Sequence, residues 1–180
     1  ISRSNRVFYN IRHLVPTWLK RQLYYTLIHS QLYYCLLVWG TTSKTNLIRL
    51  TLLQKQAVRH IENLAYLDHT APFFLKNEIL KVDQLYSLKL ATYIHSKMRQ
   101  NESMFTHMYL TNRNPYILRH SHLEVPFCRT KYGTKQLKYM IPSFLNQHPQ
   151  LLSNVYEVSS KSLFKRVVKL YLLSCVPFIV

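Results

Sequence analysis

Carboxylate side chains, which hold the divalent cations of polymerases and nucleases, are few and widely spaced in this chain. It contains seven acidic residues, and no two of them lie within four positions of each other. Two-metal catalysis needs carboxylates that hold the cations about 4 Å apart. The only aspartates are Asp68 and Asp83, and most of the acids have the sequence context of helix caps or helix surfaces. The sequence therefore indicates no site for metal-dependent phosphoryl transfer.

Histidine and cysteine residues form no recognisable catalytic or metal-binding motif. His120 and His122 precede Cys128 and could be imagined as zinc ligands, but no Cys-x-x-Cys pair accompanies them. A Cys–His nucleophilic site would need an orienting third group, which the sequence does not identify. Cys35 and Cys175 lie far from Cys128, so the three cysteines form no disulfide framework. They favour a reducing compartment, in the nucleus or the cytoplasm.

Basic residues dominate the first third of the chain, where they are interleaved with aromatic residues. The first acidic residue is Glu62, and nine basic residues precede it. Residues 62–102 carry no net charge, whereas residues 103–180 hold ten basic and two acidic residues. Basic blocks repel themselves unless an anion lies against them, most commonly a nucleic-acid backbone. The alternative is a solvated basic surface on an ordinary helical domain. The nine N-terminal basic residues are Arg3, Arg6, Arg12, Lys20, Arg21, Lys44, Arg49, Lys55 and Arg59.

The elements that would position these cations are predicted to be helices. The chain has only two glycines, so it can form few tight hairpins and no glycine-rich phosphate loop. Apolar residues recur at helical spacing, as in Leu19, Leu23 and Leu27. The expected helices cover about residues 16–37, 46–61, 70–77, 84–99 and the stretch that follows Ser159 or Ser160.

Two segments are predicted to be non-helical, and one apolar run can be interpreted in two ways. Residues 101–122 lack periodicity and have the composition of a linker or an exposed loop. Residues 123–128 alternate as in a short edge strand, with which residues 136–140 could pair. The apolar run at residues 33–40 is expected to end the first helix in the core, with Trp39 as its anchor. A base-stacking platform is the alternative.

The apolar stretches and the first residues of the chain indicate whether it meets a membrane and whether it belongs to a longer protein. No stretch of 18 apolar residues offers a membrane span, so we expect no membrane partner. The chain begins at Ile1 without a signal-peptide pattern, and we expect it to be part of a longer protein.

An ordered series of segments resembles the part of non-LTR retrotransposon (LINE) reverse transcriptases that follows the palm. Each segment is short, but they occur in the same order and cover nearly the whole chain. They are most similar to the jockey and chicken-repeat clades. The segments are LYYTLIHSQLYYC (residues 23–35), VWG (38–40), KTNL (44–47), LQKQAVR (53–59), HTAPFF (69–74), CRTKYG (128–133) and SLFK (162–165).

The resemblance implies a thumb, the group of helices that grips the backbone of the template–primer duplex. It also implies a parent protein with RNA-directed DNA polymerase activity and, usually, an N-terminal endonuclease. The chain lacks the fingers and the palm, including the aromatic-Ala-Asp-Asp motif that binds the catalytic metals. It also lacks the zinc knuckle of some LINE clades, and it has Phe144-Leu145-Asn146 where family members often carry a Trp-Asn pair.

These observations together predict a mainly α protein, a helical thumb-like bundle followed by a small, mostly helical segment in which one short β-hairpin could form. The expected regions are a thumb-like region (1–66), a helical connector (67–109) and a C-terminal segment (110–180) with a loop, short strands and a terminal helix. The expected partners are an RNA or DNA template–primer and the palm and fingers of the parent. No cofactor is expected in this fragment, because Mg²⁺ belongs to the parent's palm, and the fragment is expected to be inactive by itself. The candidate phosphate contacts are Lys20, Arg21, Lys44, Arg49, Lys55 and Arg59.

Two alternatives from other functional classes remain open at this point. The chain could be a decayed transposon relic without a selected function. It could also be a helical adaptor whose basic faces meet an acidic protein. The salt dependence of polynucleotide binding separates a nucleic-acid partner from an acidic protein.

Overall fold

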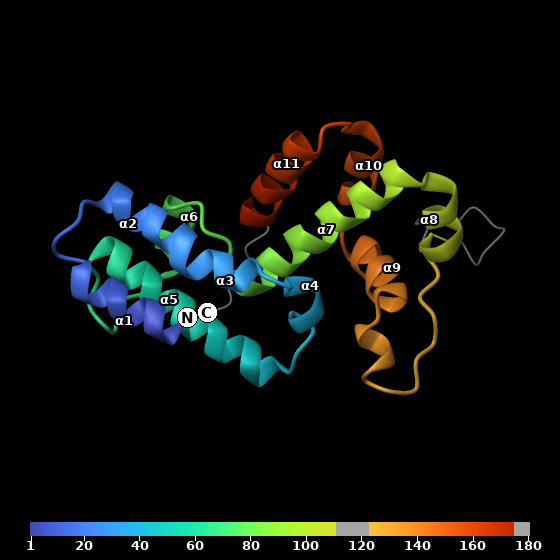
Figure 1. Cartoon of the computed structure of the whole chain (residues 1–180). Helices are drawn as coiled ribbons and strands as arrows, with labels where there is room; N and C mark the ends of the chain where they lie inside the picture. Colours follow the sequence, from blue (N-terminus) through green and yellow to red (C-terminus); the bar gives the residue numbers. More distant parts are fainter. Residues whose placement is uncertain (111–122, 175–180) are drawn as a thin grey trace. The chain divides into compact units, whose positions relative to one another are not determined.

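A computed structural model describes residues 1–110 and 123–174, and nearly all regular structure in them is helical (Figure 1). The mainly α fold expected from the sequence is confirmed. By compactness the chain divides into two units. Unit 1 holds residues 1–87 together with 171–174, and unit 2 holds the described residues between 88 and 170. The expected division into regions 1–66, 67–109 and 110–180 stays a prediction.

Unit 1 is built around α5, against which α1 and α2 pack (Figure 1). Its core includes the fully buried side chains of Phe8, Tyr24, Ile28 and Ile61. Burial of each such side chain contributes about 1.5–3 kcal/mol. The helices of unit 1 are α1 (Ser2–Ile11), α2 (Thr17–Leu23), the π-helix η1 (Tyr24–His29), α3 (Ser30–Tyr33), α4 (Leu36–Trp39), α5 (Lys44–Glu62), α6 (Ala71–Lys76) and the start of α7 (Val82–Gln100).

The helix expected over about residues 16–37 ends earlier than predicted. It runs through α2, η1 and α3, and then breaks where Tyr34 becomes extended and Cys35 adopts a left-handed conformation with φ 47°. The indole N–H of Trp39 donates to the carbonyl of Tyr34 at 2.7 Å, so this carbonyl keeps a partner at the break. Trp39 is therefore half-buried beside the break, whereas the prediction made it a core anchor. Tyr34 and Val38 are largely exposed.

Helix α5 is 19 residues long and carries a buried amide side chain. It begins after Ser43, slightly before the predicted start, and ends at Asn63, whose left-handed conformation (φ 54°) terminates it. Gln54 is fully buried, and its amide donates to the Tyr24 hydroxyl (2.9 Å) and the Leu80 carbonyl (2.7 Å). These bonds offset much of the cost of burying a polar group. They also tie α5 to η1 and to the chain before α7.

The next two helices of unit 1 lie close to their predicted positions. α6 begins at Ala71 with Pro72 in its first turn, where a missing N–H costs nothing. α7 begins at Val82, so Asp83 lies in the first turn and does not precede the helix as predicted. A carboxylate in a first turn is favourable because it faces the positive end of the helix dipole.

Unit 2 combines the rest of α7 with shorter helices. Phe164 is fully buried and stacks on His95, with ring centroids 4.3 Å apart and planes inclined by 14°. His95 Nε2 donates to the Val158 carbonyl at 2.7 Å. The helices of unit 2 are the rest of α7, α8 (Glu102–Tyr109), the 3-10 helix η2 (Gly133–Lys135), α9 (Leu137–Gln147), α10 (Pro149–Glu157) and most of α11 (Lys161–Ser174).

The hairpin expected in unit 2 is wrong. Leu123 occupies one isolated bridge position, residues 124–128 form no strand, and residues 137–140 begin α9. The side chain of Asn146 replaces a second strand, because it accepts from the Leu123 N–H (2.8 Å) and donates to the Leu123 carbonyl (2.9 Å). Pro126 also lacks the N–H that a ladder needs.

The loop expected over residues 101–122 is also corrected in part. Its beginning forms helix α8, where the Asn101 side chain accepts from the N–H of Met104 (3.3 Å) as an N-cap. The remaining part, residues 111–122 with His120 and His122, lies outside the described residues, as does Cys175. The helix expected after Ser159 or Ser160 is confirmed as α11.

Candidate nucleic-acid interface

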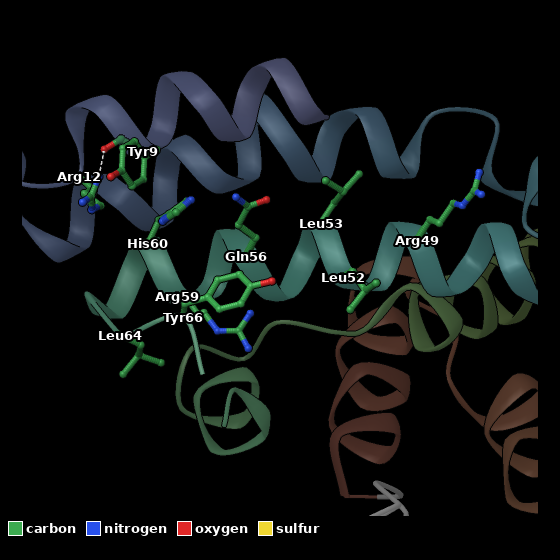
Figure 2. Close-up of a pocket in the computed structure, with 10 residues that line it drawn as sticks. All are labelled: Tyr9, Arg12, Arg49, Leu52, Leu53, Gln56, Arg59, His60, Leu64 and Tyr66. Atoms are coloured by element: carbon green, nitrogen blue, oxygen red, sulfur yellow. Dashed lines mark hydrogen bonds between the residues drawn. The ribbon is translucent and has the colours of Figure 1, made fainter. Parts of the chain in front are cut away.

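An open groove of about 740 Å³ lies in unit 1 alongside α5 (Figure 2). We call it the α5 groove. Its side chains come from α1, from α5 and from the turn that follows α5. Its volume lies within the range of small-molecule binding sites. The lining residues are Tyr9, Arg12, Arg49, Leu52, Leu53, Gln56, Arg59, His60, Leu64 and Tyr66.

Helix α5 presents a continuous stripe of residues to the groove. Arg49, Leu53, Gln56 and His60 follow one another at steps of three or four, so they lie on one face of the helix. Arg59 borders this stripe. Ten positions separate the two arginines of α5, which corresponds to about 15 Å along the helix axis. The groove is thus long enough to hold two separated anionic groups.

The turn after α5 closes one rim of the groove. Asn63 ends the helix in a left-handed conformation, and the Asp68 carboxylate accepts from the Ala65 N–H at 2.8 Å. This hydrogen bond joins a side chain to a backbone N–H three positions away, so it stabilises the turn locally. Tyr66 lies in this turn and is 84% exposed, so most of its ring is accessible to solvent.

Two arginine–tyrosine pairs are found in the groove (Figure 2). The Arg12 guanidinium lies 3.5 Å from the centre of the Tyr9 ring, and its Nη1 donates to the Tyr9 carbonyl at 2.6 Å. The Arg59 guanidinium lies 5.8 Å from the Tyr66 ring, and its Nη2 donates to the Asp68 carbonyl at 3.2 Å. Such pairs contribute about 0.5–1 kcal/mol each at exposed sites. They hold both cations in place before any ligand arrives.

His60 is the most buried polar residue of the lining. It is 8% exposed and meets the rings of Phe8 and Tyr9 edge to face, at centroid distances of 6.0 and 5.5 Å. Its Nε2 is buried and has no hydrogen-bond partner among the described residues. Burial lowers the pKa of His60, and the nearby charges of Arg12 and Arg59 lower it further. His60 is therefore neutral at pH 7.

The electrostatic character of the groove is uniformly positive. Three of the described residues that line it are arginines, and none of these lining residues is acidic. Glu62, at the end of α5, is held elsewhere: its carboxylate accepts from Lys76 (2.6 Å) and from Asn77 (2.7 Å). An arginine guanidinium matches phosphate or carboxylate geometry in two-point contacts. The lining residues therefore favour an anionic ligand over a cationic one.

Of the six candidate phosphate contacts, Arg49 and Arg59 lie in the α5 groove. Lys55 is also on α5 but is half-buried and outside the groove lining. Lys44 is exposed at the first position of α5. Arg21 is exposed on α2, where its Nη2 lies 3.4 Å from the Asn77 carbonyl.

Lys20 occupies an interior position that the sequence interpretation did not foresee. It is 2% exposed, and its ammonium donates to the Asn63 side chain at 2.8 Å. Burial lowers its pKa, as does the charge of Arg12. The Leu19/Leu23/Leu27 repeat marked Leu19 as the inward-facing neighbour, yet Leu19 is only half-buried. Lys20 therefore fixes the end of α5 and is not presented to a surface ligand.

The groove residues that the sequence interpretation missed include Tyr9, Arg12, His60 and Tyr66. One local signal existed, because Tyr9 and Arg12 are three positions apart and so face the same side of a helix. These two residues meet His60 because α1 packs against α5. Local residue spacing does not predict this packing.

Among the described residues, no group of three or more His, Cys, Asp and Glu side chains could hold a metal ion. In the same part of the chain, no helix combines the length and apolar character needed to cross a membrane. Comparisons of the chain with protein-family models, with curated proteins and with solved structures find no match.

Proposed function

We propose that this chain is the thumb and the following C-terminal segment of a non-LTR retrotransposon (LINE) reverse transcriptase, and that it grips a template–primer by its phosphate backbone. The observation that carries the proposal is the α5 groove, which gathers Arg49 and Arg59 of α5 with Arg12 at the end of α1 and has no carboxylate among its lining residues. Arginine and lysine contacts to phosphates supply most of the affinity in sequence-independent nucleic-acid binding.

The segments that carry the resemblance support this assignment by where they lie. Residues 53–59 form the middle of α5 and contribute Leu53, Gln56 and Arg59 to the groove. The same segment contains Gln54, whose two buried hydrogen bonds hold α5 in place. The similar residues thus both line the groove and position it.

The proposed role is binding, with chemistry assigned to the rest of the parent protein. The palm of that parent would hold Mg²⁺ with its paired aspartates and, together with the fingers, would be the partner of this segment. The fragment by itself is expected not to extend a primer. Its contribution is to hold the duplex, through side chains such as Arg49 and Arg59, while the palm acts on the primer end.

Fluorescence anisotropy of labelled duplexes tests the proposal. Three duplexes of unrelated sequence are titrated with the full chain at four salt concentrations. The three groove arginines, together with one or two exposed neighbours such as Lys44, would neutralise four or five phosphates. The expected slope of log affinity against log salt is then about −4. Sequence preference is expected to be slight, because no groove-reading element accompanies these cations.

A pair of double variants locates the contact. Arg49→Ala with Arg59→Ala should weaken binding of all three duplexes alike and flatten the salt slope by about two. Arg3→Ala with Arg6→Ala is the matched control, since it removes the same charge from exposed positions of α1 outside the groove. A flat salt response of the parent chain, or discrimination above about a hundredfold between duplexes, contradicts the proposal. Equal effects of the two double variants contradict the groove as its site.

A further inference from the structure

The α5 groove contains aromatic and apolar side chains that contacts with a phosphate backbone would not explain. Tyr66 stands 84% exposed at one rim, and Tyr9, 49% exposed, stands at the other with Arg12 against its ring. Leu52 and Leu64 add apolar surface to the lining. Large exposed aromatic and apolar side chains within a cationic groove call for a ligand with a flat apolar face.

Single-stranded nucleic acid has this combination, and a duplex does not. In a duplex the base faces are stacked inside, so its outer surface offers phosphates and sugars. In a single strand the bases can lie on aromatic rings while arginines hold the backbone. The groove has a volume of about 740 Å³, within the range of sites for small molecules, so it can enclose one nucleotide, whereas a duplex would meet its arginines only through the phosphates on its outer surface.

Two buried nitrogen atoms strengthen the case for an enclosed polar ligand. His60 Nε2 and Arg59 Nε are both buried, and neither has a hydrogen-bond partner among the described residues. Buried polar atoms are normally paired, and each exception calls for an explanation. Both side chains line the groove, so a rotation that uncovers either nitrogen would let a base edge or a phosphate oxygen in the groove supply the missing partner.

We propose that the α5 groove binds an unpaired nucleotide of a single strand, with its base stacked on Tyr66 and with phosphates of the same strand held by Arg59 and Arg49. The inference rests on the proposed function for the ligand, a nucleic acid, and goes beyond it in specifying a single strand. The two arginines lie about 15 Å apart along α5, which exceeds the spacing of adjacent phosphates, so they would hold phosphates more than one nucleotide apart.

The experiment compares a single strand with its own duplex on the full chain. A fluorescein-labelled strand of twelve thymidine nucleotides (dT12) is titrated alone and after annealing to twelve deoxyadenosine nucleotides, at one fixed salt concentration. The chain is used as the parent and as three variants. Tyr66→Ala removes the ring, Tyr66→Phe keeps it, and Leu67→Ala is the matched control. Leu67 is the next residue, is 85% exposed and lies outside the groove lining.

The expected result is a preference for dT12 over the duplex, and a loss of about tenfold in dT12 affinity in Tyr66→Ala, the effect of one lost stacking contact. Tyr66→Phe and Leu67→Ala should bind dT12 as the parent does. Duplex affinity should be equal in all four proteins. Both tyrosine substitutions are at an exposed turn position, and the melting temperature of each variant shows that the fold is retained.

The contrary outcomes separate this inference from the proposed function. If the duplex binds with a steep salt response while Tyr66→Ala leaves dT12 affinity unchanged, the single-strand inference is wrong and the backbone grip stands. If neither dT12 nor the duplex binds, both are wrong. Displacement of dT12 by a ten-residue glutamate peptide as readily as by unlabelled dT12 overturns the inference in favour of an acidic protein ligand.

Discussion

The two units of this protein differ in how they arrange positive charge. Unit 1 spans sequence positions 1–87 and 171–180, with eleven basic and four acidic residues, whereas positions 88–170 hold thirteen basic and three acidic residues. Unit 2 is thus the more basic by sequence, yet among the described residues the groove lined by three arginines and by aromatic rings lies in unit 1. Net charge therefore does not predict which unit gathers cations in a groove, because this depends on how the helices pack.

Unit 2 has a groove of its own, of about 270 Å³, with a different character. It is lined by His107, Tyr109, Glu124 and Lys138, among others, so a carboxylate lies beside its one lysine. A groove with both signs of charge offers no net attraction to a polyanion. Along α11, exposed cations such as Lys161 and Arg166 point into solvent. The α5 groove of unit 1 therefore remains our proposed site for a nucleic-acid strand.

The largest expected effect comes from a matched pair of core truncations, one in each unit. Phe8→Ala in unit 1 and Phe164→Ala in unit 2 each remove a buried ring and should each lower the free energy of unfolding by about 3–5 kcal/mol. Phe8 contacts His60, whereas Phe164 contacts His95. Urea unfolding, followed by circular dichroism, measures the loss of stability.

Strand binding distinguishes the two variants further. Under conditions where both remain folded, Phe8→Ala should weaken dT12 affinity, because the His60 side of the groove loses its support. Phe164→Ala should bind dT12 as the parent does. Equal loss of affinity in the two variants would remove the functional difference between the units.

An intermediate effect is expected from the polar contact inside unit 1. Tyr24→Phe deletes the hydroxyl that accepts from Gln54 but leaves the bond from Gln54 to the Leu80 carbonyl. The variant should lose about 1 kcal/mol of stability, the usual net worth of one buried hydrogen bond. Tyr25→Phe is the control, since Tyr25 is 37% exposed. Urea midpoints of the two variants give the answer, and an unchanged Tyr24→Phe would show that the contact does not stabilise unit 1.

The smallest effect concerns pH and distinguishes His60 of unit 1 from His148 of unit 2. Burial lowers the pKa of both histidines, and the Arg12 and Arg59 charges lower that of His60 further. A histidine in the unfolded chain titrates near about 6.5. Below that pH the unfolded chain binds more protons than the folded one, so stability present above about 6.5 is lost as the pH falls toward the folded pKa.

A bound phosphate should weaken the pH dependence of stability that comes from His60, and leave that of His148 unchanged. It would offset the arginine charges and raise the His60 pKa, so saturating dT12 should reduce the loss of stability between pH 7 and 5.5. Urea midpoints at three pH values, with and without dT12, measure this difference. His60→Gln, which cannot titrate, should lose less stability on acidification than the parent and should show no such difference. A parent and a variant with the same pH response would exclude His60 as the titrating group.

The helices that were predicted from the sequence depend on local spacing, whereas α1, α8, α9 and α10 were not predicted. The apolar repeat before Tyr34, the stretch that became α5 and the Pro72 start of α6 all act within one or two turns. The hairpin prediction failed because the side chain of Asn146, 23 positions further on, forms hydrogen bonds with both the N–H and the carbonyl of Leu123. These are the groups that a second strand would have bonded. The break at Cys35 was missed although its contact is local: the indole N–H of Trp39, five positions further on, donates to the carbonyl of Tyr34.

The sequence predicted that basic residues of the first third would face an anion, but it identified only some of the residues that line the groove. A block of nine cations without a counter-charge indicated an anionic partner, and Arg49 and Arg59 do line the groove. Lys20 was misassigned because its charge suggested exposure, whereas the end of α5 covers it and Asn63 binds it.

The sequence by itself determined the helical class, the sign of the charge and the absence of closely spaced carboxylates, because composition and local periodicity are properties of short stretches. The tertiary structure alone decided which cations meet which rings. Tyr9 and Arg12 come to lie with His60 only because α1 packs against α5, with Phe8 buried between the helices. Contacts between residues some fifty positions apart depend on packed shape, which no local pattern encodes.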